Sequence, residues 1–447
     1  MIFYKPMGRT PYFTAGVLLL ALKYNLDRAI ASLGFHRSWF FWNYIEPRPV
    51  AGIEAVPPPE HSFYFVLLLT SLPFLFVGLI LTLRRLKSAA LPLPLCLLFF
   101  VPVVNLVFFV VLSVIPERPA PGSESLPLPR GSWLPTGAVE SALTSTLLVS
   151  VAGLGLVLLS INYLQNYGWG LFVALPFALG LVSVLLYAGR EPRSLKSCLV
   201  VSIMPLGFIG LGMFFMAFEG LICLFMALPI AAILALAGGF VGYLIVGNRR
   251  APLPPSAITL ILASVPFWMG MEYRAGVPPP LLSVTSSVIV NAPPEKVWPY
   301  VIEFPPISED RGWILRTGVA YPTRARIVGR GVGSIRHCIF STGEFVEPVE
   351  VWDEPNLLKF SVAMQPEPMK ELSPYPHIKT THLDGYFLSH EGQIKLTPLP
   401  GGRTLLEGTT WYTDRIWPTA YWQIWSDYLI HEIHLRVLRH IKALAET

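Results

Sequence analysis

Four histidines near the C-terminal end are the residues that suggest chemistry most directly. His431 and His434 lie three residues apart in "HEIH", so they share one face of a helix. With His382 and His390 they could in principle form a metal cluster, or one of them could act as an acid or base inside a cavity. The zinc motif HExxH spaces its histidines by four, however, and "HEIH" does not match it. We therefore expect solvated or capping roles, and we predict no metal site, no cofactor and no catalytic residues.

Two further sites place charge in an apolar part of the chain. Lys23 and Asp27 are four residues apart, so they can pair on one helix face. We interpret them as interfacial side chains that snorkel, with an intramembrane functional pair as the alternative. Glu219, in "FEGLIC", lies at a turn between two apolar stretches. We expect it to cap the next helix rather than to relay protons.

The composition indicates a membrane protein with a separate polar domain. Of the 447 residues, 53% are hydrophobic and 14% are charged, and the mean hydropathy is +0.55; soluble proteins carry about 25% charged residues. Only 16 of the 33 Lys and Arg lie after residue 282, but 18 of the 28 Asp and Glu do. The basic first part suits anionic lipid headgroups, and the mildly acidic second part gives no reason to expect nucleic acid. The second part holds a single cysteine, Cys338, which excludes an internal disulfide there.

Apolar stretches long enough to cross a bilayer fill the first part of the chain. A hydrocarbon core of about 30 Å needs about 20 apolar residues in a helix. Eight stretches qualify, at roughly 12–32, 62–83, 91–115, 139–162, 169–188, 198–218, 221–246 and 257–272. Lys5, Arg9 and "RRLK" (84–87) predict a cytoplasmic N-terminus, whereas the basic residues at 190–196 and 249–250 disagree. Eight crossings would return the C-terminal domain to the cytoplasm.

The domain boundaries follow from this change of composition. We predict an integral membrane domain over 1–274, a linker over 275–283 and a folded domain over 284–447. The linker reads "AGVPPPLLS", and its prolines favour an extended segment of about 3.1 Å per residue. Such a linker would hold the folded domain within about 30 Å of the bilayer.

The last domain reads as one strand, one helix, a short helix, six strands and a final helix. Its first strand alternates from Val284, and the helix that follows has an apolar face around Trp298. The final helix, in "WPTAYWQIWSDYLIHEIHLRVLRHIKALAE", has apolar residues three or four positions apart. An antiparallel sheet of this length curls around that helix, and we expect a cavity between them. The Pro-rich segment 364–382 could be a lid or could lie on the membrane surface.

The ordered segments "VNAPPEKVWPYV", "GSIRHCIFSTGEFVEPVEVWDEPNLLKFSV" and "GQIKLTPLPGGRTLLEGTTWYT", with the long final helix, resemble the START-like superfamily. That superfamily includes the bacterial polyketide cyclase/dehydrase and lipid-transport group, SRPBCC. The resemblance covers about 284–446 and implies a helix-grip fold, in which a curved antiparallel sheet grips the last helix around an apolar tunnel. Members bind lipids, sterols, polyketides or hormones, and some are enzymes.

A second resemblance concerns the N-terminal region. "MGRTPYFTAGVLLLALKYNLDR" with "RRLKSAALPLPLCLLFFVPVVNLVFFVVLSVIPE" is similar to a bacterial family of multi-spanning membrane proteins of unknown function. It implies architecture over about 1–120 and the inner membrane of a bacterium. It implies no chemistry.

These observations support two functions of different classes. The first is an integral membrane protein whose START-like domain binds lipid or another apolar small molecule at the bilayer surface, for transfer or sensing. The second is a membrane-anchored cyclase/dehydrase-type enzyme that acts on a lipid- or polyketide-like substrate. The enzyme requires a histidine beside a carboxylate in the cavity, and His337, His382, His431 and His434 are the candidates. A domain that only scaffolds partner proteins, none of which the sequence identifies, would have a filled core.

The residues expected to line the tunnel are large and apolar. If the resemblance holds, they come from the inward face of the last helix and from facing strand positions, although aromatic residues at these spacings can equally fill a core. The predicted lining residues are Phe340, Phe345, Phe360, Phe387, Trp411, Trp422, Trp425, Leu429 and Ile433.

Overall fold

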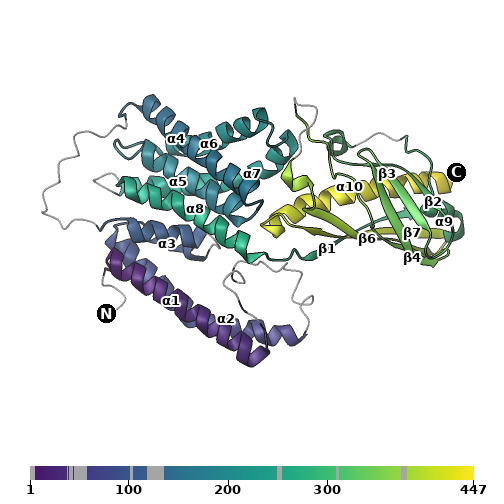
Figure 1. Cartoon of the computed structure of the whole chain (residues 1–447), viewed down its shortest axis with the longest axis horizontal. Coiled ribbons are helices and arrows are strands. Elements are labelled where there is room, and N and C mark those ends of the chain that lie inside the picture. The colour runs from purple at the N-terminus through teal and green to yellow at the C-terminus, as the bar shows by residue number, and fades with distance from the viewer. Residues whose placement is uncertain are drawn as a thin grey trace, which may run out of the picture. The chain divides into compact units, whose positions relative to one another are not determined.

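The computed structural model describes residues 6–37, 39, 44, 58–100, 104–117, 135–248, 254–308, 312–373 and 380–447. The chain divides into two compact units. Unit 1 comprises Met1–Gly212 and Ala227–Val277, and unit 2 comprises Met213–Met226 and Pro278–Thr447. The chain therefore passes between the units at three places. Figure 1 shows both units, with most of their helices and strands labelled.

Unit 1 is built from helices. Their bounds are α1 (Arg9–Ala29), α2 (Pro58–Ser88), α3 (Val104–Val114), α4 (Ala138–Leu158), α5 (Leu175–Tyr187), α6 (Leu195–Phe215), α7 (Leu221–Gly247) and α8 (Pro255–Ala275). A 3₁₀-helix, Leu93–Phe100, precedes α3, and short π-helical turns extend α1 and α4 and precede α5. The end of α6 and the beginning of α7 belong to unit 2.

Five of the described helical segments are long and apolar enough to cross a membrane. They are Val66–Ser88, Ala138–Tyr163, Gly170–Tyr187, Leu195–Phe215 and Leu221–Gly247. The prediction of eight spans is thus supported in part. The described parts of the stretch predicted at 91–115 form the 3₁₀-helix Leu93–Phe100 and α3, which has 11 residues. The stretches at 12–32 and 257–272 form α1 and α8, which do not meet this length and hydropathy standard.

Close packing holds α5 inside unit 1. In the segment Gly170–Tyr187, 94% of the residues are buried by protein, against 11–33% of the residues in the most apolar part of the other four candidate spans. A Cβ added at Gly180 would lie 2.0 Å from the carbonyl oxygen of Ala235, and one added at Gly238 would lie 2.0 Å from that of Phe177. Small residues let helix backbones approach this closely in membranes. The two glycines therefore fix the contact between α5 and α7.

The pair Lys23–Asp27 forms on α1 as its spacing predicts. The Asp27 side chain is fully buried, and it also accepts a hydrogen bond of 2.6 Å from the Tyr44 hydroxyl. Asp27 is therefore surrounded by protein groups, and the position of the pair near the membrane interface stays a prediction.

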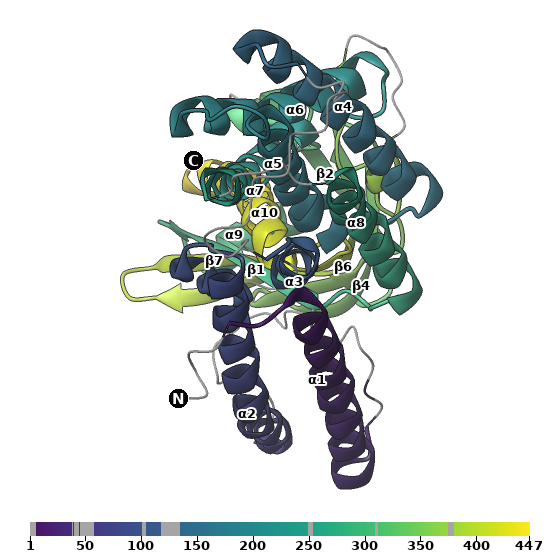
Figure 2. The same ribbon diagram turned by 90° about the vertical axis from the view of Figure 1, so that its left-hand side faces the viewer.

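Unit 2 contains a seven-stranded antiparallel sheet with the order β1-β7-β6-β5-β4-β3-β2. The strands are β1 (Leu281–Val290), β2 (Pro322–Val328), β3 (Ile335–Phe340), β4 (Glu344–Asp353), β5 (Leu357–Ser361), β6 (Phe387–Leu399) and β7 (Arg403–Asp414). Helix α9 (Pro294–Ile302) and the 3₁₀-helix Trp313–Arg316 follow β1, and α10 (Thr419–Glu446) ends the chain. This is the predicted order of elements. The curled sheet and α10 fit a helix-grip fold, and Figure 2, which views α10 close to end-on, shows the strands around it.

The sheet buries one face against α9 and α10. In β1, Leu282, Val284 and Ser286 alternate with exposed residues, as a half-buried strand requires. The main core combines residues of both helices with strand residues; among them are Trp298, Phe304, Phe360, Leu406, Leu438 and Ile441. Strand β1 begins at Leu281, shortly after α8 ends at Ala275. The segment without regular structure between them, 276–280, is shorter than the predicted linker.

Candidate functional site

The turn between α6 and α7 is built into unit 2. We call residues 213–226 the hairpin segment. Its Ile222 is buried in a second core with Ile314, Leu315, Val319 and Met369, and Leu429 and Ile433 of α10 pack against that core. The Leu221 amide donates a hydrogen bond of 3.1 Å to the Leu372 carbonyl. The Tyr421 hydroxyl donates one of 2.5 Å to the Met226 carbonyl.

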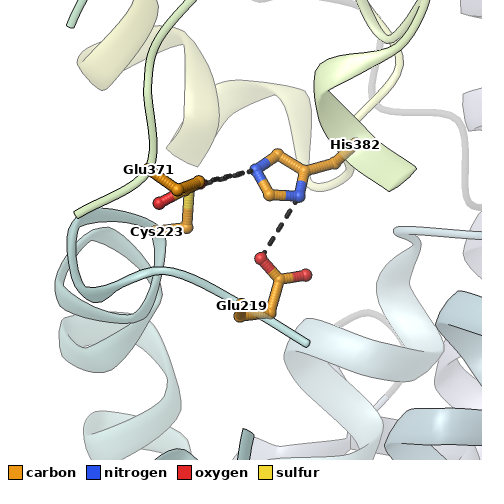
Figure 3. Close-up of side chains that lie close together, drawn as sticks. All are labelled: Glu219, Cys223, Glu371 and His382. Atoms are coloured by element: carbon orange, nitrogen blue, oxygen red, sulfur yellow. Dashed lines mark hydrogen bonds and ion pairs between the residues drawn. The ribbon is translucent and has the colours of Figure 1, made fainter. Parts of the chain in front are cut away.

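Four polar side chains converge beside this second core. Glu219 and Cys223 come from the hairpin segment, Glu371 from the segment after β5, and His382 from the 3₁₀-helix Thr381–Leu383 (Figure 3). The Cys223 sulfur lies 3.0 Å from Nε2 of His382 and 2.8 Å from Oε1 of Glu371. Nε2 and that Glu371 oxygen are 3.6 Å apart. On the other side of the imidazole, Nδ1 lies 3.3 Å from Oε2 of Glu219.

These side chains are buried, and the carboxylates of Glu219 and Glu371 lie on both sides of the His382 ring. The side chains of Glu219, Glu371 and His382 are 6%, 2% and 9% exposed. Burial alone would lower the pKa of His382, but the adjacent Cys223 sulfur and Glu219 carboxylate favour the imidazolium more strongly. The pKa of His382 is therefore raised well above its ordinary value. The site favours a positive charge at or near this ring.

Sequence reasoning did not find this group. It grouped His382 with other histidines and interpreted Glu219 as a helix cap. Cys223 lies within the apolar stretch predicted at 221–246 and was not singled out. The four residues offer ligand atoms within 4.8 Å of one another and could hold a metal ion. Their separation along the chain exceeds 140 positions between the hairpin segment and Glu371, so no local motif marks them. The sequence offers one signal for this group, which is the charged residue Glu219 between the apolar stretches 198–218 and 221–246.

The two histidines of "HEIH" lie between α10 and the sheet. Nδ1 of His431 is 2.7 Å from the Ser286 hydroxyl, and Nδ1 of His434 is 3.1 Å from the same oxygen. Nε2 of His434 is 2.8 Å from the Thr410 hydroxyl. Burial, followed by the proximity of His431, lowers the pKa of His434 to about 4. The expected solvated or capping role is therefore wrong for His434, which is a neutral, partly buried residue with hydrogen-bond partners on the sheet.

The structure does not bring the nine predicted lining residues into one group. Phe360 is buried in the main core, and Phe340 and Phe345 pack against that core. The ring centroids of Phe340 and Phe345 are 4.7 Å apart. Leu429 and Ile433 pack in the second core, and Phe387 packs against a third cluster that contains Tyr412. Whether any of these residues contacts a ligand stays a prediction.

The remaining three are tryptophans, and they have different surroundings. Trp422 is buried, with a relative exposure of 6%. The ring of Trp425 lies 6.2 Å from that of Phe225 in the hairpin segment. Trp411 alternates with the buried residue Tyr412 on β7, and Lys359 lies over its ring at 5.6 Å. Trp411 is thus on the sheet face opposite to Tyr412, which packs toward α10.

Comparisons with solved structures cover the C-terminal third of the chain. XoxI from Bacillus cereus is 17% identical over 36% of this chain and 93% of its own, with a TM-score of 0.23. Truncated norcoclaurine synthase from Thalictrum flavum is 17% identical over 38% and 95%, with a TM-score of 0.25. The Zhui aromatase/cyclase from Streptomyces sp. R1128 is 14% identical over 37% and 94%, with a TM-score of 0.24.

No family model and no curated protein matches the chain. Identities and TM-scores this low say nothing about what the chain binds. The fold of unit 2 is therefore described from its own strand order and from α10, which fit a helix-grip domain; the described residues of the chain also include five candidate membrane spans.

Proposed function

We propose that unit 2 binds an apolar molecule, in the first place a bilayer lipid, at the membrane surface, and carries, senses or presents it. The observation that supports this function best is the hairpin segment. It connects two candidate membrane spans, Leu195–Phe215 and Leu221–Gly247, yet it belongs to the compact unit formed by the helix-grip domain. A domain whose core includes the turn between two spans is attached to the membrane by its own fold.

Apolar side chains connect this turn with α10. Ile222 lies at the beginning of α7, and its core includes Leu429 and Ile433, two of the predicted lining residues. Around the same junction, large apolar side chains are exposed: Leu221 is 49% exposed, Phe225 50%, Leu372 51% and Ile424 66%. Groups of exposed apolar residues mark membrane or ligand contacts. They support a route by which a lipid tail reaches α10 without entering water. Exposure of the tail to water would cost about 0.8 kcal/mol for each CH₂ group.

Photo-crosslinking tests this function in the complete chain. The full-length protein would be placed in lipid nanodiscs that contain a phospholipid with a diazirine in its acyl chain, and labelled peptides would be identified by mass spectrometry. We expect labelled peptides from α10 between Thr419 and Ile433, in addition to those from the spans. Leu429→Asn should lower labelling of α10 several-fold, whereas Leu405→Asn on β7 should not. Labelling confined to unit 1 in the wild type would contradict the proposal.

A second function, the enzyme, is favoured by a separate observation. His382 lies beside a carboxylate and a thiol, which are groups that can take and return protons. An enzyme of cyclase/dehydrase type would act on a lipid- or polyketide-like substrate at this place. Lipid extracts of cells that express the wild type or His382→Asn would be compared by mass spectrometry. A product that requires His382 would support the enzyme, and identical extracts would argue against it.

We further propose that unit 2 lies on the cytoplasmic side of a bacterial inner membrane. The basic residues after the second apolar stretch support this orientation if the predicted stretches at 91–115 and 257–272 also cross the bilayer, because the hairpin segment and the C-terminal domain then both return to the side of residues 84–87. Arg85 also has a structural role, because its Nε donates to the Leu112 carbonyl at 2.9 Å. A cysteine introduced at the exposed Ser283 reports the side directly. It should react with a membrane-impermeant maleimide in inverted vesicles and not in intact spheroplasts; the opposite pattern would place unit 2 outside.

A further inference from the structure

We propose that Cys223, His382 and Glu371 bind a zinc-type divalent ion, and that Glu219 orients His382 for this purpose. The proposal goes beyond lipid binding and does not depend on it. The three ligand atoms are Sγ of Cys223, Nε2 of His382 and Oε1 of Glu371 (Figure 3). Sulfur, imidazole nitrogen and carboxylate oxygen are the ligands that Zn²⁺ uses in proteins, with distances of about 2.0–2.3 Å.

The spacing of these three atoms is close to that of a tetrahedral site. Bonds of about 2.3 Å to sulfur and about 2.1 Å to nitrogen and oxygen place sulfur about 3.6 Å from each of the other two, and nitrogen about 3.4 Å from oxygen. The observed nitrogen–oxygen separation is 3.6 Å. The sulfur is 3.0 Å and 2.8 Å from the two atoms. An outward movement of the sulfur by less than about 1 Å therefore completes the geometry.

The orientation of the imidazole separates ligands from supporting groups. Nε2 faces Cys223 and Glu371, whereas Nδ1 faces Glu219 at 3.3 Å. One ring cannot direct both nitrogens at the same ion. Glu219 pairs with the Nδ1 side of the ring at 3.3 Å, and in the metal-bound form it would hold the Nδ1 hydrogen and leave Nε2 free to coordinate, as carboxylates do behind metal-bound histidines. Three protein ligands leave a fourth position for water or a small ligand.

Charge and hydrogen bonding also indicate a cation. A thiol carries one proton, and here the sulfur contacts both a carboxylate oxygen and an imidazole nitrogen. The second oxygen of Glu371, Oε2, is buried without a hydrogen-bond partner among the residues that the structure describes. A buried carboxylate without full compensation is costly. A divalent ion at this place would compensate the Glu371 carboxylate and the Cys223 thiolate together.

The same four residues also permit a different chemistry, a cysteine nucleophile activated by His382 and Glu219. In that arrangement Nε2 takes the thiol proton and Nδ1 is held by a carboxylate. The oxygen of Glu371, 2.8 Å from the sulfur, argues against it, because a carboxylate beside a thiolate raises the cost of forming it unless a cation is present. The nucleophile is therefore an outcome that the experiment must detect.

The experiment uses the full-length protein in detergent, freed of metal and titrated with Co²⁺ and then Zn²⁺. We expect one Co²⁺ per chain, a thiolate-to-cobalt absorption band in the near ultraviolet, and displacement by Zn²⁺. Cys223→Ser should abolish the band, whereas Cys96→Ser, a matched change in the membrane unit, should leave it. Glu219→Gln should keep the band but weaken binding about 10–100-fold, as the loss of an orienting carboxylate does.

A second experiment uses only the wild-type protein, so its result does not depend on whether the variants fold. Alkylation of Cys223 by iodoacetamide would be followed by peptide mapping with and without Zn²⁺. Protection of Cys223 by Zn²⁺, with Cys96 unaffected, supports the metal site. Rapid alkylation that Zn²⁺ does not slow, together with no cobalt band, overturns it and indicates the nucleophile. Because lipid labelling of α10 and metal binding are measured in separate experiments, failure of one proposal is distinguishable from failure of the other.

Discussion

Acid should loosen α10 from the sheet, and His434 should be the main cause. His434 has a pKa of about 4 in the folded protein because it is buried between α10 and β7, whereas an unfolded histidine titrates near 6.5. The folded state thus binds the proton less well than the unfolded state. The stability that neutral His434 contributes to the docked α10 is fully present above about pH 6.5. It is lost progressively as the pH falls toward 4.

The magnitude follows from these two values. With a pKa of about 6.5 when α10 is detached and about 4 when it is docked, lowering the pH from 7 to 5 costs about 2 kcal/mol, or about 20-fold in the opening equilibrium. The groups in contact with His434 add little pH dependence of their own. They are the Ser286 and Thr410 hydroxyls, which carry no charge, and His431 on the same helix.

Hydrogen exchange measured by mass spectrometry provides the assay, because it reports opening of α10 within the complete membrane protein. Exchange of α10 peptides at pH 5, 6 and 7 would be corrected for the intrinsic pH dependence of amide exchange. We expect His434→Gln, which keeps hydrogen-bonding capacity without the titration, to remove about 2 kcal/mol of the pH dependence. His390→Gln, at an exposed position on β6, is the control. Equal pH dependence in His434→Gln and the wild type would refute the reasoning.

Three further predictions concern other parts of the fold. Burial raises the pKa of Asp414 to about 6 despite hydrogen bonds from the Ile416 amide and the Ser426 hydroxyl. The stability contributed by the protonated Asp414 carboxyl is therefore lost as the pH rises through 6, which is opposite to the effect of His434. Asp414→Asn should remove about 1 kcal/mol of this pH dependence in the same exchange assay. Glu347→Gln leaves the buried Arg336 charge uncompensated and should destabilise unit 2 by about 3–5 kcal/mol in limited proteolysis, whereas the exposed Glu350→Gln should change little. Gly180→Ala places a methyl group against the Ala235 carbonyl and should cost about 1–3 kcal/mol, seen as a lower melting temperature in detergent, while Gly207→Ala meets nothing within 4 Å and should be neutral.

Local patterns predicted the elements of unit 2 correctly. The alternation that begins near Val284 produces β1, and the apolar spacing after Thr419 produces α10, because both periodicities are set by residues close in sequence. The face of a strand residue is less secure. Trp411 lies on the face of β7 opposite to the buried Tyr412, because neighbouring residues of a strand face opposite sides of the sheet. A bulge between Ser389 and Glu391 shifts the pairing of β6 with β7, and the alternation of one strand does not reveal such a shift.

The candidate metal site could not be predicted in the same way. Cys223 and Ile222 lie in an apolar run, and such residues read as lipid-facing or bundle-facing in a span. Their partners, His382 and Ile314, are distant in sequence and come from segments of irregular structure or short 3₁₀-helices. Only the tertiary fold brings them together. The same distance explains why Glu219 was interpreted through its nearest helix alone.

The three passages of the chain between the units have a consequence for how the protein is made. The hairpin segment leaves the ribosome with its two spans before any strand of unit 2 has been synthesised. Ile222 and Cys223 therefore remain without Ile314 and His382 until these residues are synthesised, and α10 is translated after every strand of unit 2. Completion of this face is a late step of biogenesis, and a chain terminated before β1 would leave the tip of α7 without the neighbours that cover it.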